Sequence, residues 1–192
     1  MTTFYICRHG ESESNKNGRL MGWLDSPLTD EGVKNAESSA NKLAGVAFDK
    51  IVSSDLGRAF TTAYIISRKF NYTSEIERYK GLREVAYGDI ANMPYSAYPE
   101  LSPEENAKYA PPNGESLEQM EARAVKCIMD IANQNPDKTI LIVTHDGVIN
   151  AVKSVFKKQN IGTTDQDPHN PHDFVAKFAM DNDQINSFKE VK

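Results

Sequence analysis

The sequence contains little cysteine and no long apolar run. Cys7 and Cys127 are its two cysteines, and their neighbours place one in a strand pattern and the other on the apolar stripe of a helix. We therefore expect two buried thiols and neither a disulfide nor a metal pair. Arg8, His9 and Glu11 follow the amino terminus after only a few apolar residues. The sequence therefore predicts no signal peptide and no transmembrane helix, and a cytoplasmic location.

Positive charge is also scarce. The formal net charge is -5 and the calculated pI is about 5.4, which argues against a general nucleic-acid-binding or membrane-binding surface. Any anion site therefore has to be built from a few placed cations. We find no internal repeat and no low-complexity tract, and a length of 192 residues with 39% hydrophobic content favours one domain, residues 1–192.

Strand-like and helix-like patterns alternate along the chain. Strands are expected near residues 4–7, 50–53, 74–77 and 139–143, and the last is typical of a central strand covered on both faces. Helices are expected to follow the capping residues Thr29, Ser54, Asp55 and Ser116, and another should follow His145 and bury Val155 and Phe156. Two more strands are expected over 174–188, with a turn at 181–183. The pattern predicts a three-layer α/β/α sandwich with a mostly parallel central sheet.

Proline and tyrosine interrupt this regular pattern between residues 87 and 113. The segment contains Pro94, Pro99, Pro103, Pro111 and Pro112 together with Tyr87, Tyr95, Tyr98 and Tyr109. It is too aromatic for a pure linker and too rich in proline for one long helix. We predict that it forms a lid or side wall, in which the tyrosines either pack together or contact a substrate.

Three junctions between a strand and the element that follows carry residues suited to binding an anion. Arg8 and His9 follow the first strand, Arg58 lies in the first turn of a predicted helix, and His145 follows the strand at 139–143. Ligands bind at the carboxyl ends of strands in open α/β sheets, and helix N-termini offer free N–H groups. Taken singly, each junction is better explained by a structural cation or an ordinary loop histidine than by a binding site.

Taken together, the motifs resemble those of the histidine phosphatase superfamily, in its phosphoglycerate mutase-like branch. They occur in the family's order and cover most of the chain up to about Val155. The matching residues are Arg8-His9-Gly10-Glu11-Ser12 with Asn15, then Gly22, Asp25, Pro27, Leu28, Thr29 and Gly32, then Ser53-Ser54-Asp55-Leu56 with Arg58-Ala59 and Thr62-Ala63, then Leu82-Arg83-Glu84, Gly114-Glu115-Ser116 and Val143-Thr144-His145-Asp146-Gly147.

The resemblance implies a phosphatase that works through a phosphohistidine on a small-molecule phosphate ester. His9 would attack the phosphorus, and Arg8, Arg58 and His145 would surround the phosphoryl oxygens. Substrate binding would also involve Asn15, Gly22 and Asp146. No metal and no cofactor is expected, because two arginines and a second histidine supply the positive charge. The oligomeric state cannot be read from the sequence.

Two residues compete for the role of proton donor to the leaving group. Glu84 follows Leu82 and Arg83 as the donor does in the mutase-like branch, and it is the favoured candidate. Asp146 resembles instead the aspartate of the His-Asp pair in the acid phosphatase branch. Its position after a strand also suits a helix N-cap.

The predicted lid favours hydrolysis over mutase activity. Mutases of the family resemble one another in carrying basic residues there, whereas here Lys108 is accompanied by Asp89, Glu100, Glu104 and Glu105. Such a wall should bind one phosphate well and a second anion poorly. A cofactor-dependent phosphoglycerate mutase and a non-catalytic phosphate-binding module are the alternatives.

A polar loop near the carboxyl end offers one further alternative. His169 and His172 with Asp165, Asp167 and Asp173 have the residue types of a metal cluster, but they lack a ligand-spaced partner elsewhere. We favour a solvated loop that borders the site.

Overall fold

The computed structural model describes residues 1–165, 169–181 and 183–192. In this part of the chain six strands form one sheet in the order β3-β2-β4-β1-β5-β6. They are β1 Thr2–Arg8, β2 Lys50–Ser54, β3 Glu77–Tyr79, β4 Thr139–Thr144, β5 Val175–Asp181 and β6 Gln184–Glu190. The pairs β1–β4, β2–β4 and β2–β3 are parallel, whereas β1–β5 and β5–β6 are antiparallel. The sheet is mixed, with a parallel majority as predicted.

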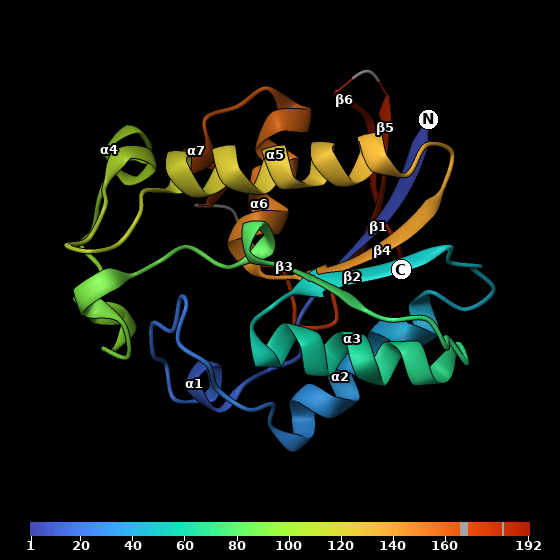
Figure 1. The fold of residues 1–192 in the computed structure, drawn as a ribbon. Helices are drawn as coiled ribbons and strands as arrows, with labels where there is room; N and C mark the ends of the chain where they lie inside the picture. The colour runs from blue at the N-terminus through green and yellow to red at the C-terminus, as the bar shows by residue number, and fades with distance from the viewer. Residues whose placement is uncertain (166–168, 182) are drawn as a thin grey trace.

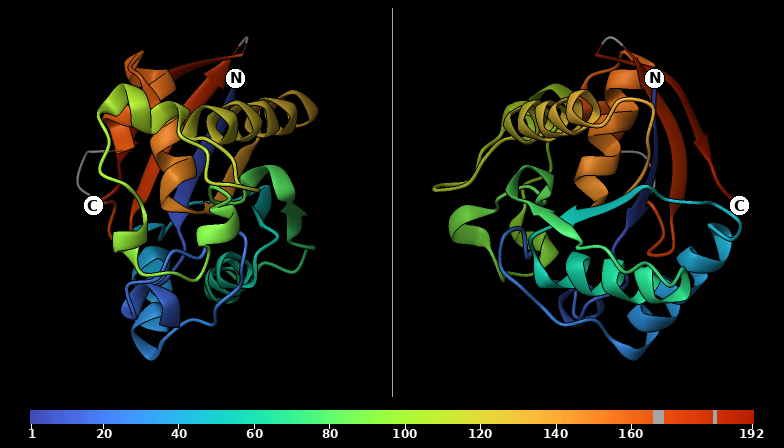
Figure 2. Two further views of the ribbon diagram at one scale, coloured as in Figure 1. Left: turned by 90° about the vertical axis from the view of Figure 1, so that its left-hand side faces the viewer. Right: turned by 45° about the vertical axis from the view of Figure 1, so that its right-hand side comes forward.

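Helices cover both faces of this sheet. On one face α2 Asp30–Lys42 packs with α3 Gly57–Lys69, and on the other α5 Leu117–Gln134 packs with α6 Asp146–Lys157 (Figure 1). Two further views show the same separation (Figure 2). The shorter elements are α1 Glu13–Lys16, η1 Lys80–Leu82, η2 Gly88–Ile90, η3 Tyr95–Ala97, α4 Pro103–Lys108 and α7 Ile161–Asp165. The α/β/α sandwich is confirmed, and none of the described helices is both long and apolar enough to cross a membrane.

Strand β4 sends alternate side chains into the two layers. Ile140 and Ile142 join the core beneath α5 and α6, whereas Leu141 and Val143 join the core beneath α2 and α3. All four are fully buried. The prediction of a central strand covered on both faces is therefore confirmed.

Both cysteines are free thiols. Cys7 is fully buried on β1, and Cys127 is half-buried on α5, where burial raises the pKa of its thiol to about 11. The expectation of two buried thiols holds fully for Cys7 and in part for Cys127.

Two of the predicted helix starts are confirmed, and one is wrong. The Thr29 hydroxyl accepts a hydrogen bond from the N–H of the third residue of α2, and Ser116 forms a capping box with Gln119. Ser54 and Asp55 do not cap α3, because Ser54 ends β2 and the Asp55 carboxylate forms an ion pair with Arg83 at 2.7 Å. The N-cap of α3 is Leu56, whose apolar side chain has no acceptor.

Other differences from the expected pattern concern positions at the margins of elements. Strand β3 begins at Glu77 and not at Ser74. Glu77 is its first residue to pair with β2, where it lies opposite Val52. Val155 and Phe156 stay 37% and 38% exposed, since they lie in the last turn of α6. Two strands follow residue 174 as predicted, while Asn182 in the expected turn lies outside the described residues.

Candidate active site

A cavity of about 470 Å³ lies where β1, β2 and β4 reach their carboxyl ends, and its volume is typical of a small-molecule site. Of the eight residues predicted to take part in catalysis or substrate binding, seven line it, namely Arg8, His9, Asn15, Gly22, Arg58, Glu84 and Asp146. His145 lies beside the cavity, with its ring centroid 5.0 Å from that of His9. The structure thus brings together residues that are far apart in the sequence.

The imidazole of His9 is fixed by a contact to its own loop. Its Nδ1 lies 2.7 Å from the carbonyl oxygen of Gly10, and because a carbonyl only accepts, Nδ1 carries the hydrogen and Nε2 keeps its lone pair. Burial, together with the charges of Arg58 and Arg8, holds the pKa of His9 well below its usual value. The ring is therefore neutral at physiological pH, and the lone pair of Nε2 accepts a hydrogen bond from Nε of Arg58 at 3.3 Å.

Several buried polar atoms around His9 lack hydrogen-bond partners within the described part of the protein. Both ring nitrogens of the fully buried His145 and the buried Nε of Arg8 have none. Leaving buried polar groups unpaired is costly, so their presence indicates a polar ligand. The other end of Arg8 is held in place, because its Nη1 donates to the backbone carbonyl of Asn170.

Arg58 joins the second strand-to-helix junction to the loop at residues 17–28. Its Nε points to His9 Nε2 at 3.3 Å, and its Nη1 and Nη2 donate to the carbonyls of Leu24 and Gly22, each at 2.8 Å. The side chain is 3% exposed. Burial lowers the pKa of its guanidinium, but an arginine stays protonated.

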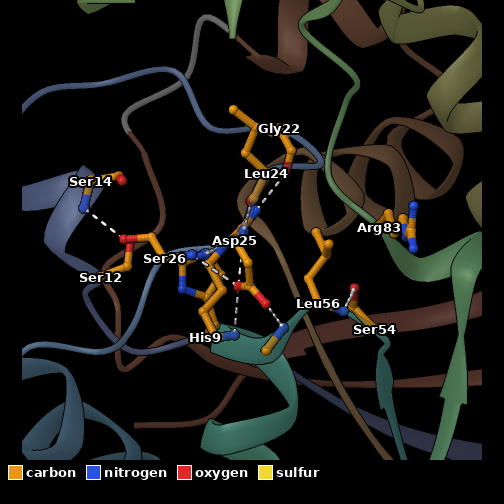
Figure 3. Close-up of polar contacts among 12 residues, drawn as sticks. His9, Ser12, Ser14, Gly22, Leu24, Asp25, Ser26, Ser54, Leu56 and Arg83 are labelled. Carbon is orange, nitrogen blue, oxygen red and sulfur yellow. Dashed lines mark hydrogen bonds and ion pairs between the residues drawn. The ribbon is translucent and has the colours of Figure 1, made fainter. Parts of the chain in front are cut away.

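Asp25 supplies the cap that the local sequence of α3 lacks. Its carboxylate oxygens accept hydrogen bonds from the backbone N–H groups of Gly57 at 2.7 Å and Arg58 at 3.3 Å, and Figure 3 shows it directed at the start of this helix. Asp25 is among the residues that match the family motifs, but the sequence predicts no role for it. Capping by a residue about thirty positions away leaves no local signal, which is why it was missed.

Asn15 and Gly22 both line the cavity, and the structure constrains each of them. Asn15 Oδ1 accepts from the N–H of Ser12 at 3.1 Å, so the free part of its amide is the Nδ2 donor. Gly22 has a φ of +51°, and a Cβ there would lie 2.6 Å from the carbonyl oxygen of Val85. Only glycine fits this turn without strain.

The Glu84 carboxylate lies between the lid and the helix that follows β4. Its Oε1 accepts from the Val85 N–H at 2.9 Å and its Oε2 from the Gly147 N–H at 3.3 Å. Burial, with a contribution from the charge of Asp146, raises its pKa above the ordinary glutamate value. A glutamate of this kind can hold and release a proton.

Asp146 is engaged by the loop that precedes β5. Its Oδ2 lies 2.7 Å from Nδ1 of His169, and its Oδ1 accepts from the side-chain amide of Asn170 at 2.6 Å. Burial alone would raise its pKa, but the His169 hydrogen bond and the charge of Arg8 hold it below the ordinary value. The N-cap interpretation is wrong, because His145 occupies the N-cap and Asp146 is the first helical residue.

The remaining walls come from the lid and from two loops. Tyr87, Tyr95 and Tyr98 of the segment at residues 87–113 line the cavity, while Lys108 is not among the lining residues. Arg19 lines it as well, although its Nη1 donates to the carbonyl of Asn92 at 2.6 Å. Sequence analysis missed Arg19 because an arginine in a glycine-rich loop carries no periodic signal.

The segment at residues 160–173, predicted as a polar loop, contains the short helix α7, so that part of the prediction is wrong, and its described residues 169–173 border the site. His169 and His172 line the cavity, and the Nδ1 of His172 lies 3.1 Å from the backbone carbonyl of His9. No cluster of three or more possible metal ligands is formed within the described ranges, and Asp167 lies outside them.

Comparisons with known proteins place the chain in a family. The model of the histidine phosphatase superfamily (branch 1) matches residues 4–186. Phosphoglycerate mutase-like protein 4 of Arabidopsis thaliana is 31% identical over 156 residues, covering 77% of this chain and 67% of the relative. The metal-independent phosphoserine phosphatase of the same plant is 30% identical over 161 residues, covering 79% and 67%. The structure of Bacillus stearothermophilus YhfR superposes with a TM-score of 0.86 at 29% identity, covering 97% and 95% of the two chains. The chain belongs to the histidine phosphatase superfamily.

Proposed function

We propose that this protein hydrolyses a small phosphomonoester by way of a phosphohistidine on His9. The observation that carries the proposal is the neutral, oriented imidazole of His9 beside the unpaired donors of His145 and Arg8. A phosphoryl group next to Nε2 would give these donors the negatively charged oxygens that they lack. Family membership and the phosphatases among the relatives support the same reaction.

In the first step Nε2 of His9 attacks phosphorus, and the bond from phosphorus to the ester oxygen breaks. Arg8, Arg58 and His145 stabilise the charge on the three non-bridging oxygens, which is the main catalytic task in phosphoryl transfer. Glu84 gives its proton to the departing oxygen, so the alcohol leaves neutral. The charge that a metal ion often supplies comes here from the arginines, and no metal is proposed.

In the second step water resolves the phosphohistidine. The Glu84 carboxylate takes a proton from the attacking water, the P–N bond breaks, and inorganic phosphate leaves with His9 neutral again. Glu84 returns to its protonated state, so the cycle closes without a cofactor. Asp146 is not the favoured donor, because its carboxylate is already hydrogen-bonded to His169 and Asn170 and its pKa is lowered.

The walls of the cavity favour a substrate with one phosphate. Beyond His9 the lining includes the apolar and aromatic side chains of Leu20, Met21, the lid tyrosines and Leu117, with the carboxyl groups of Glu11 and Asp165 and the imidazoles of His169 and His172. Such a surface suits an alcohol that is neutral or carries an amino group, and disfavours a second anion. Arg19 is the feature that favours the mutase alternative, because its guanidinium reaches the same cavity.

The proposal is tested with purified protein and a chromogenic phosphomonoester in the presence of a chelator. We expect phosphate release that persists without added metal and disappears in His9→Ala. A panel of phosphate esters then separates the alternatives. Equilibration of 2- and 3-phosphoglycerate, primed by the bisphosphate and faster than phosphate release, would establish the mutase. Phosphate binding without turnover of any ester would establish the non-catalytic module.

A further inference from the structure

The backbone of Glu84 is held by side chains that do not line the cavity. Its carbonyl oxygen accepts from Nη2 of Arg123 at 2.7 Å and from Nε1 of Trp23 at 2.8 Å. Arg123 lies on α5 and Trp23 in the loop at residues 17–28. Two elements distant in sequence therefore meet on one atom of the residue that we assign as the proton donor.

Arg123 also holds the residues before Glu84. Its Nη1 donates to the carbonyls of Gly81 at 3.0 Å and Arg83 at 2.8 Å. One guanidinium thus binds three carbonyls of residues 81–84. This uses the planar fork of arginine, which a lysine ammonium cannot reproduce.

Glu115 holds the other end of the same segment. Its carboxylate binds Arg123 through Nε at 3.0 Å and through Nη2 at 2.5 Å, and it accepts from the N–H of Ala86 at 2.9 Å. The side chains of Arg123 and Glu115 are largely buried, with exposed fractions of 22% and 15%. The pair therefore brackets Glu84 on both sides along the chain.

Trp23 completes the arrangement from the outside. The guanidinium carbons of Arg83 and Arg123 lie 4.9 Å and 5.7 Å from the centroid of its rings, so the indole lies against both cations. Trp23 itself is 45% exposed. Its burial therefore does little for the core, and its contacts to Glu84 and the arginines are its main interactions.

We propose that Arg123, paired with Glu115 and assisted by Trp23, is a positioning residue that sets the Glu84 carboxyl group against the leaving oxygen of the substrate. The proposal rests on the function proposed above for Glu84. It assigns no chemical step to Arg123, which touches neither His9 nor the cavity among the contacts described.

Two variants test this proposal against leaving groups of different strength. Arg123→Lys keeps the charge but not the fork, and Trp23→Phe removes one N–H while keeping a ring. For an alkyl phosphate, whose leaving oxygen needs a proton, we expect kcat/KM to fall about 100-fold in Arg123→Lys, the size of effect that a misplaced catalytic group produces. Trp23→Phe should lose about tenfold in kcat/KM, as one hydrogen bond would. For nitrophenyl phosphate, whose leaving group needs no proton, both variants should keep a kcat/KM close to that of wild type, because kcat/KM excludes the later step in which Glu84 acts on water.

Arg78→Lys is the matched control, because Arg78 also lies over an aromatic ring, that of Phe60, and is remote from the cavity. It should change neither substrate's kcat/KM. Equal losses on both substrates in Arg123→Lys and Trp23→Phe would overturn the proposal, since they would indicate a structural role alone.

A second readout does not depend on turnover. The pKa of the Glu84 side chain, followed by carbon NMR, should shift from its raised wild-type value in Arg123→Lys and stay unchanged in Arg78→Lys. An unchanged Glu84 pKa in Arg123→Lys would overturn the positioning proposal even if no ester is hydrolysed. Failure of the proposed function is recognised separately. In that case the wild-type protein has the raised pKa at Glu84 but releases no phosphate from any ester.

Discussion

At the scale of single residues, burial and neighbouring charge favour opposite protonation states for two residues that line the same cavity. His9 has a lowered pKa because burial and two arginines oppose its protonation, while Glu84 has a raised pKa because burial opposes its ionisation. A neutral base and a neutral acid can therefore coexist below neutral pH. This is the combination that nucleophilic attack with protonation of the leaving group requires.

The pH dependence of kcat/KM follows from these two shifts. Activity should fall in acid, as His9 becomes protonated below its lowered pKa, and in alkali, as Glu84 loses its proton above its raised pKa. Together the two limbs give a bell-shaped pH profile of kcat/KM, with its optimum on the acidic side of neutrality. With an alkyl phosphate, whose leaving group needs the proton, the alkaline limb should disappear in Glu84→Gln, and with nitrophenyl phosphate it should be weak already in wild type. An alkaline limb that persists unchanged in this variant would assign it to another group.

The choice of proton donor is testable by comparing two amide variants. Glu84→Gln should lower kcat/KM on an alkyl phosphate by about 10² to 10⁴, the usual contribution of a general acid, and affect kcat/KM on nitrophenyl phosphate far less. Asp146→Asn should affect both substrates alike, because its carboxylate holds His169 and Asn170 in place. The opposite pattern would make Asp146 the donor.

At the scale of elements, the sequence predicted most of what local chemistry determines. Residues at the junctions after β1, β2 and β4 were identified because apolar runs end there, and Thr29 and Ser116 were identified because their caps act within three residues. Asp25 and Arg123 were not assigned roles, because each acts on backbone groups about thirty or more positions away. Such contacts exist only once the layers have packed.

A close approach between the loop after β1 and α2 sets the position of His9. A Cβ at Gly32 would lie 2.0 Å from the carbonyl oxygen of Glu11, and one at Gly10 would lie 2.1 Å from the carbonyl oxygen of Gly32. The atoms that an added Cβ would meet belong to the backbone in both cases, so no flexible side chain can move to make room. We expect Gly32→Ala to lower the free energy of unfolding by about 1 to 3 kcal/mol, as overpacking does, and to reduce kcat through the displaced loop.

Urea unfolding monitored by circular dichroism measures this effect. Asn41→Ala, at an exposed position of the same helix, is the control and should change stability by less than about 0.5 kcal/mol. A Gly32→Ala protein as stable as the control would show that the two segments separate easily.

At the scale of the whole molecule, the site lies between the two helical layers, at the edge of the sheet where β1, β2 and β4 end. Arg58 comes from α3 on one face, Glu84 is held by α5 on the other, and the histidines follow β1 and β4 in the middle of the sheet. The strand order could not be derived from the sequence, because pairing of β1 with β4 joins segments more than a hundred residues apart. The mostly parallel sheet was nevertheless expected, since strands alternated with helices.

Burial of His145 between the helical layers makes the free energy of unfolding depend on pH. The folded-state pKa of His145 lies well below the value of about 6.5 expected in the unfolded chain, so the unfolded state binds a proton that the folded state does not. As pH falls below about 6.5, wild type should therefore lose stability relative to His145→Gln by about 1.4 kcal/mol per pH unit, until the folded-state pKa is reached. Urea unfolding of both proteins over a pH series measures this difference, and a pH-independent difference would contradict the lowered pKa.

The central claim is that the phosphoryl group passes through His9, and the most direct measurement is a rapid-quench reaction with a phosphate-labelled ester. We predict label on His9 in an alkali-stable, acid-labile linkage, which forms before inorganic phosphate appears and decays as phosphate is released. Hydrolysis of the ester with no label on His9 at any time would contradict the account.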